Sequence, residues 1–261
     1  MSILLTPYVQ GALCHGNTWV VQDEAGLAEQ IAGVALGQSR HVAKILAGAN
    51  LGPPPTTASA AHGAVQLLTA KGDPWHRDGW MFQVMSWVAA YAAAPAGVIR
   101  APQMIQAEKG FDGLQLDLDA VSGEVRAVII FEDKATDYPR DTITKQVWPD
   151  FKLLEAGDRE NVLTAEVVAL LQTVPNIDVD LAIQNIIWKN LRHYRVSITV
   201  GNTHAGESGR QQLFHDFDAI ASGALAKRRA ETFHVQNLRK WMAALAEKAI
   251  AVVHAKAESS V

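Results

Sequence analysis

The pattern of apolar and polar positions is most regular in the middle of the chain, where it predicts a β-hairpin. Apolar and polar residues alternate from Leu114 to Asp119, a period of two that is typical of a strand with one solvent-facing side. After a turn at 121–124, the segment from Val125 to Phe131 is apolar at nearly every position. Such a run indicates a strand covered on both faces, so we expect the second strand to lie nearer the centre of a sheet.

Charged residues stand at the open end of the predicted hairpin. Asp112 precedes the first strand, while Glu132 and Lys134 follow the second and share one face, with Asp133 on the other. A three-residue loop would place Asp112 opposite Lys134 on the same face. A loop of two or four residues would shift the register by one residue and separate them, unless a β-bulge restored it. The sequence leaves these registers open.

The chemistry of these side chains points to a metal ion and a phosphate. Mg²⁺ prefers oxygen ligands in octahedral geometry and is commonly held by one or two carboxylates together with water. A lysine beside such a site can orient a water molecule or offset charge that develops on a phosphoryl group. If Asp112 meets Glu132 and Lys134, the cluster is therefore suited to the hydrolysis of phosphodiesters.

The spacing of these residues resembles that of a known family. Asp112, then nineteen residues, then Glu132-Asp133-Lys134 after a hydrophobic strand is similar to the PD-(D/E)xK phosphodiesterase superfamily, over about residues 75–151. The resemblance implies a restriction-endonuclease-like fold in which Asp112 and Glu132 bind Mg²⁺, or Mn²⁺ as a substitute. It also implies that the backbone carbonyl of Asp133 is a metal ligand and that Lys134 acts on the attacking water.

The resemblance suggests accessory positions as well. The helix before the hairpin often supplies a glutamate in this superfamily, and here Gln83 stands where such a residue is expected, with Glu108 as an alternative from the following loop. Lys145 and Gln146, on a helix after the second strand, are candidates for contact with phosphate. Gln83 is equally compatible with a buried, hydrogen-bonded amide, and Lys145 with an ordinary solvated helix face.

A structural interpretation of the charged cluster competes with the catalytic one. Acidic and basic residues are common at strand ends, where an exposed pair contributes little free energy. Glu132, Asp133 and Lys134, however, end the most hydrophobic strand of the chain, where burial of charge is costly. We therefore favour a functional role for the cluster.

The rest of the pattern alternates helices and strands and predicts an α/β fold, with a mixed central sheet of about four or five strands flanked by helices. Residues 1–56 are expected to be an N-terminal elaboration, and residues 57–261 a nuclease-like domain with a C-terminal helical segment. A strand is predicted at 193–200, and a long helix from 224 to 254. The aromatic residues of the helix before the hairpin are expected to pack in the core: Trp80, Trp87 and Tyr91.

Composition narrows the classes of function. The 261 residues carry a net charge of −4, which argues against an autonomous nucleic-acid binder and requires of a nuclease either a local basic lining or a partner that delivers the substrate. No apolar run approaches the roughly 18 to 20 residues of a membrane span and no basic leader is present, so we expect a cytoplasmic protein. Cys14 is the single cysteine, which excludes an intramolecular disulfide.

These observations lead to one expected function and two alternatives. We expect a Mg²⁺-dependent nuclease that hydrolyses DNA rather than RNA, with restriction or anti-phage defence as its setting by analogy. One alternative is a catalytically silent interaction protein that has kept the nuclease fold. The other is a nuclease subunit that is active only with a helicase, an ATPase or a sensor protein. A homodimer is compatible with each of these.

Overall fold

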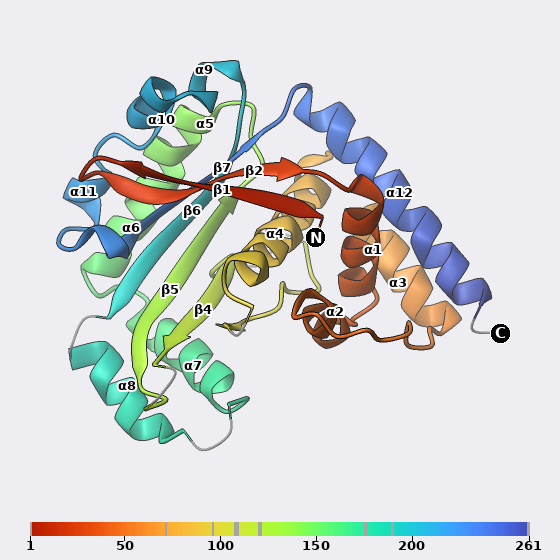
Figure 1. The fold of residues 1–261 in the computed structure, drawn as a ribbon, viewed down its shortest axis with the longest axis horizontal. Helices are drawn as coiled ribbons and strands as arrows, with labels where there is room; N and C mark the ends of the chain where they lie inside the picture. Colours follow the sequence, from red (N-terminus) through yellow and green to blue (C-terminus); the bar gives the residue numbers. More distant parts are fainter. Residues whose placement is uncertain are drawn as a thin grey trace.

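Seven strands in the described part of the chain form one mixed sheet, in the order β1-β2-β7-β6-β5-β4-β3 (Figure 1). The computed structural model describes residues 2–70, 72–95, 97–106, 110–119, 122–174, 177–188 and 191–259, without the side chains of 185–188. The strands are β1 (Ile3–Gln10), β2 (Cys14–Val21), β3 (Val98–Ile99), β4 (Gly113–Leu118), β5 (Val125–Lys134), β6 (Arg192–Val200) and β7 (Arg228–His234). The α/β prediction is confirmed, but the estimate of four or five strands is too low.

The strand direction reverses three times across the sheet. Strands β2, β7, β6 and β5 are parallel to one another, whereas β1 is antiparallel to β2 at one edge, and at the other edge β4 is antiparallel to both β5 and β3. As predicted, β5 is the more central strand of the hairpin that it forms with β4, because it lies between β4 and β6. Its alternate side chains therefore enter two different hydrophobic cores.

Helices cover both faces of the sheet, and α12 runs along one side of the molecule (Figure 1). The helical segments are α1 (Glu24–Ala35), α2 (Ser39–Leu46), α3 (Ala58–Leu68), α4 (Trp75–Ala93), α5 (Pro139–Thr142), a π-helical turn (Ile143–Val147), α6 (Trp148–Glu155), α7 (Glu160–Leu171), α8 (Val179–Trp188), α9 (Asn202–Ala205), α10 (Glu207–Leu213), α11 (Phe217–Ile220), a 3₁₀ turn (Leu225–Lys227) and α12 (Leu238–Glu258).

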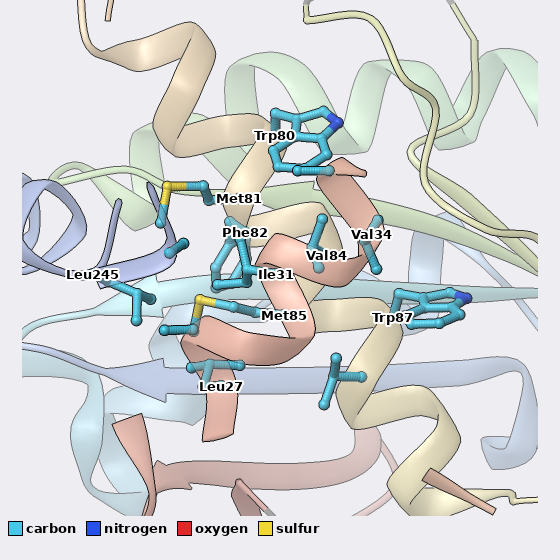
Figure 2. Packing of buried hydrophobic residues seen from close by; sticks show 14 of the residues in the cluster. Leu27, Ile31, Val34, Trp80, Met81, Phe82, Val84, Met85, Trp87 and Leu245 are labelled. Atoms are coloured by element: carbon cyan, nitrogen blue, oxygen red, sulfur yellow. The ribbon is translucent and has the colours of Figure 1, made fainter. Parts of the chain in front are cut away.

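Helix α4 is the centre of the first core. Its buried side chains include Met81, Phe82 and Met85, which belong to one cluster with residues of α1, α3 and α12 (Figure 2). Phe131 and Ile129 of β5 reach the same cluster from the sheet. Burial of this continuous apolar surface fixes α4 across the sheet, and with it every polar side chain that α4 carries toward the hairpin.

The expected core position holds for Trp80 and Trp87 of α4, whereas Tyr91 is only partly buried. Trp80 is 2% exposed and Trp87 is 3% exposed, so neither ring is available to a base. The second core lies on the opposite face of the sheet, where Val128 and Ile130 of β5 meet side chains of α6, α7 and α11. Cys14 is buried in this second core.

The predicted helix from 224 to 254 is wrong in its first part. Residues Arg228–His234 form β7, and helix α12 begins only at Leu238. The strand buries charged side chains that the local pattern assigns to a solvated surface: Arg228 donates to the carbonyls of Leu13 and Ala221, at 2.7 and 2.8 Å. Hydrogen bonds to distant segments therefore stabilise a strand that local propensity does not favour.

The first 56 residues share the sheet and the first core with the rest of the chain. Strand β2 pairs with β7 in parallel register, with Thr18 opposite Thr232. Ile31 of α1 and Leu245 of α12 belong to one buried cluster (Figure 2). The segment that we expected to be an elaboration thus completes the sheet at one edge.

Candidate active site

The hairpin of β4 and β5 brings Asp112 to the same face as Glu132. In the body of the hairpin Gly113 pairs with Phe131, so the next position along each strand sets Asp112 opposite Glu132. At the tip, Leu118 pairs with Val125, a register that would instead place Asp112 opposite Phe131 and on the other face. A β-bulge between Asp117 and Leu118 shifts the pairing by one residue and restores the shared face.

Lys134 joins the two carboxylates. Its Nζ lies 2.7 Å from Glu132 Oε2 and 3.1 Å from Asp112 Oδ2. The backbone N–H of Asp133 also donates to Asp112 Oδ2, at 2.8 Å. The structure therefore brings together the three side chains that the spacing singled out, and the backbone of the fourth residue closes the group.

The side chain of Gln83 enters this cluster from α4. Its Nε2 donates to Asp112 Oδ1 at 2.7 Å, so both oxygens of that carboxylate accept hydrogen bonds. Gln83 is thus neither a solvent-facing residue nor an amide of the apolar core. It occupies the position next to the first carboxylate where the family resemblance led us to expect a third acidic residue.

The carboxylate of Asp133 points to the opposite face of the sheet, toward α4, as the strand period requires. Its Oδ1 accepts a hydrogen bond of 2.6 Å from Ser86 Oγ, and Ser86 in turn accepts one of 2.8 Å from Arg195. Ser197 Oγ lies 3.1 Å from Ser86 Oγ. All four residues are buried, so the strand that carries Glu132 and Lys134 is fixed from behind by a polar network.

Sequence reasoning missed this network. The relevant signal is the polar row His193, Arg195, Ser197 and Thr199 in β6, since a strand at the centre of a sheet has no solvent-facing side. Polar residues on such a strand need partners inside the protein. Arg195 also lies 4.4 Å from the centre of the Phe131 ring, which places an apolar surface against its guanidinium.

Burial dominates the ionisation of the cluster. Burial raises the pKa of Glu132 to about 7, although the neighbouring ammonium group of Lys134 acts to lower this pKa. Burial also raises the pKa of Asp133, an effect that the charge of Arg195 opposes. For Lys134, burial lowers the pKa, but the charges of Asp112 and Glu132 outweigh this and bring it above its ordinary value. Lys134 is therefore a protonated hydrogen-bond donor at neutral pH.

A pocket of about 580 Å³ opens beside these residues, lined by Gln83, Asp112, Asp133 and Lys134. Lys134 is 22% exposed and Asp112 is 17% exposed, so a ligand in the pocket reaches both side chains. Glu132 is only 5% exposed and lies behind Lys134. The pocket thus presents a cation and a carboxylate to solvent, with a second carboxylate beneath them.

The other predicted accessory residues differ in their positions. Gln146 lines the pocket. Lys145 does not, because it is exposed on the neighbouring helical turn and pairs with Asp141 at 2.6 Å. Glu108 lies outside the described residues. Of these three candidates, the structure places only Gln146 near the cluster.

The donor atoms present fit a small divalent cation. Asp112 and Glu132 supply two carboxylates, the number that Mg²⁺ usually takes from a protein. The carbonyl of Asp133 is directed to the same edge as its N–H, toward Asp112, because an extended residue directs both groups to one neighbour. Within the described ranges, no group of three or more His, Cys, Asp or Glu side chains is arranged to hold a metal ion.

Comparison with protein-family models, with curated proteins and with solved structures gave no match for this chain. None of the helices in the described residues combines the length and the apolar character needed to cross a bilayer.

Proposed function

We propose that the protein is a metal-dependent nuclease that hydrolyses phosphodiester bonds, with DNA as the favoured substrate. The observation that carries this proposal is the position of Lys134 Nζ, within 3.1 Å of Asp112 and 2.7 Å of Glu132 at the edge of a solvent-accessible pocket. Two carboxylates and one ammonium group, largely buried and held together by a rigid sheet, form a geometry that serves phosphoryl chemistry.

Each residue has a defined part in this proposal. Asp112 and Glu132 would hold the cation, which when bound supplies Lewis-acid stabilisation of a phosphoryl oxygen and acidifies water. Lys134, with its raised pKa, donates a hydrogen bond to the attacking water or to a phosphate oxygen and offsets the negative charge of the transition state. It is not the base, because it stays protonated. Gln83 holds the carboxylate of Asp112 in one orientation.

The Gln83 amide also supports a second candidate function, an interaction protein with the same fold and no catalysis. A glutamine next to Asp112 gives one negative charge fewer than the family resemblance implies, and the amide hydrogen bond occupies Asp112 Oδ1. In that case the protein would bind no divalent cation at this site. Lys134→Ala would then alter stability alone.

Cleavage assays distinguish the two functions. Labelled single- and double-stranded DNA and RNA are incubated with the wild type, Glu132→Gln and Lys134→Ala, in Mg²⁺ or Mn²⁺ and in EDTA. We expect metal-dependent cutting that both substitutions reduce by at least 100-fold, in line with loss of an electrostatic catalytic group. Glu124→Gln, an exposed carboxylate at the far end of the hairpin, is the matched control and keeps full activity.

If the wild type cuts none of these substrates, calorimetric titration with Mn²⁺ shows whether the protein has a competent metal site. Binding that is lost in Glu132→Gln and retained in Glu124→Gln would support a competent site that needs a partner protein. Absence of Mn²⁺ binding by the folded wild type would refute the nuclease proposal.

A further inference from the structure

Two exposed aromatic side chains border the pocket that contains Asp112 and Lys134. Trp75, the first residue of α4, is 65% exposed, and Tyr138, in the loop after β5, is 74% exposed. Both line the pocket. Among the aromatic side chains that the structure describes, no other is exposed, so the two lie where a substrate would enter.

The two rings have no packing role that explains their exposure. A large aromatic group left in water forgoes the free energy that burial would give, and exposed apolar groups that cluster at one place on a soluble protein mark a binding surface. The other tryptophans whose side chains are described are buried or half-buried. The mouth of this pocket is therefore an aromatic surface next to a phosphodiester-cleaving cluster.

The cations around the pocket are already engaged. Lys134 pairs with Asp112 and Glu132, while Arg239 pairs with Asp78 at 2.7 Å and with Asp137 at 3.4 Å. The chain as a whole carries a net charge of −4. Attraction of a phosphate backbone to free cations is thus weak here, and affinity for a nucleic acid has to come from another source.

The guanidinium group of Arg239 contacts the ring of Trp75. This group lies 5.8 Å from the centre of the Trp75 ring, and it also donates to the carbonyl of Ala135, at 3.1 Å. The cation therefore faces Trp75 while it anchors the loop that leads to Tyr138. Arg239 belongs to α12, so this helix is connected both to the first residue of α4 and to the start of the loop that carries Tyr138.

We propose that the substrate is single-stranded or locally unpaired nucleic acid, whose bases stack on Trp75 and Tyr138 while the adjoining phosphate reaches Lys134. This inference rests on the proposed nuclease function and specifies its substrate. Bases stack on aromatic side chains only when they are unpaired and splayed out, because a duplex covers the faces of its bases. The pocket of about 580 Å³ suits a ligand of one or two nucleotides and not the cross-section of a duplex.

Binding in EDTA tests the proposal separately from cleavage. The probes are a fluorescein-labelled 12-nucleotide DNA strand, its RNA equivalent, the corresponding duplex, and a DNA strand with abasic sites in place of the central bases. The full chain is compared with Trp75→Ala, Tyr138→Ala, the conservative variant Trp75→Phe, and the control Leu181→Ala, an exposed apolar residue outside the pocket.

We expect Trp75→Ala and Tyr138→Ala each to weaken binding of the single strands about 5- to 150-fold, the range for loss of one stacked base. Trp75→Phe should keep most of the affinity, Leu181→Ala all of it, and the abasic strand and the duplex should bind weakly to every variant. The RNA strand decides whether the 2′-hydroxyl is accepted.

Four results would overturn the inference: unchanged affinity in both alanine variants, equal binding of the abasic strand, tighter binding of the duplex, or no binding of any single strand by the wild type. A different result would contradict the proposed nuclease function. Strands that bind through the two rings but are never cut in Mg²⁺ contradict that function and leave the binding mode in place.

Discussion

The amide of Gln83 donates a hydrogen bond of 2.7 Å to Asp112 Oδ1 and so links the helix across the sheet to the residue that precedes β4. The two residues are far apart in sequence, and neither belongs to the short motif around Glu132. Because of this contact, a charge introduced at position 83 would act directly on the carboxylate of Asp112. It also gives the site one uncharged partner where a third carboxylate would change both metal affinity and stability.

We predict that Gln83→Glu destabilises the metal-free protein and strengthens its response to Mn²⁺. A carboxylate at this distance from Asp112 repels it, so the melting temperature in EDTA should fall by several degrees. A third carboxylate should make the increase in melting temperature with Mn²⁺ larger than in the wild type. Thermal unfolding with and without Mn²⁺ measures both effects. Gln146→Glu, on the exposed side of the same pocket, should change neither by as much, and equal behaviour of the two variants would contradict the prediction.

Ser86→Ala should lower the free energy of unfolding by about 1–3 kcal/mol, the cost of leaving buried polar groups without a partner. The hydroxyl is fully buried and connects Asp133 to Arg195, so its removal deprives both buried side chains of a hydrogen-bond partner. Urea denaturation gives the free energy. Ser208→Ala, an exposed serine in α10, is the control and should differ from wild type by less than about 0.5 kcal/mol. A similar small effect for Ser86→Ala would mean that the network contributes little.

Phe82→Ala should destabilise the protein by about 3–5 kcal/mol, the usual cost of removing a fully buried aromatic ring. Phe82 is 0% exposed in the first core (Figure 2). Its ring centre lies 5.8 Å from that of Trp19. Tyr138→Ala removes an exposed ring and should leave the unfolding free energy almost unchanged. Equal losses in the two variants, measured by chemical denaturation, would argue against the described burial of α4.

The contribution of His193 to the free energy of unfolding should decrease as the pH falls from about 6.5 to 4. Burial, with the charges of Arg229 and Lys227, lowers the pKa of His193 from 6.5 to about 4. Above pH 6.5 the ring is neutral in both states, and between these values the unfolded chain binds a proton that the folded protein resists. Since one pKa unit corresponds to about 1.4 kcal/mol and solvent screens part of the effect, we expect a loss of about 1–2 kcal/mol.

Unfolding free energies of wild type and His193→Gln across this pH range isolate the contribution. As the pH falls from about 6.5 to 4, the variant should gain about 1–2 kcal/mol of unfolding free energy relative to the wild type, whereas the exposed control His254→Gln should follow the wild type. Parallel curves for wild type and His193→Gln would show that this ring does not control the acid response.

The sequence pattern predicted the helices and strands whose formation depends mainly on neighbouring residues in the chain. The hairpin, α4 and β6 follow from the spacing and length of their apolar runs, which are local features of the sequence. Strand β7 did not follow, since Arg228 and Glu231 read as surface residues until the carbonyls and the Trp19 indole that bind them are in place. The predicted number of strands was too low because the sheet also contains β7 and the hairpin of β1 and β2, which joins the sheet through the pairing of β2 with the distant β7.

The sequence by itself determined that Glu132 and Lys134 share a face and that Asp133 points away, because alternate side chains of any strand do so. It did not determine whether Asp112 would join them. The bulge between Asp117 and Leu118 made that choice, since register is set by the packing of both faces of the sheet and not by the turn alone. The tertiary structure likewise placed Gln83, Trp75 and Tyr138 around the cluster, because burial of α4 and the anchoring of its neighbouring loop are properties of the whole core.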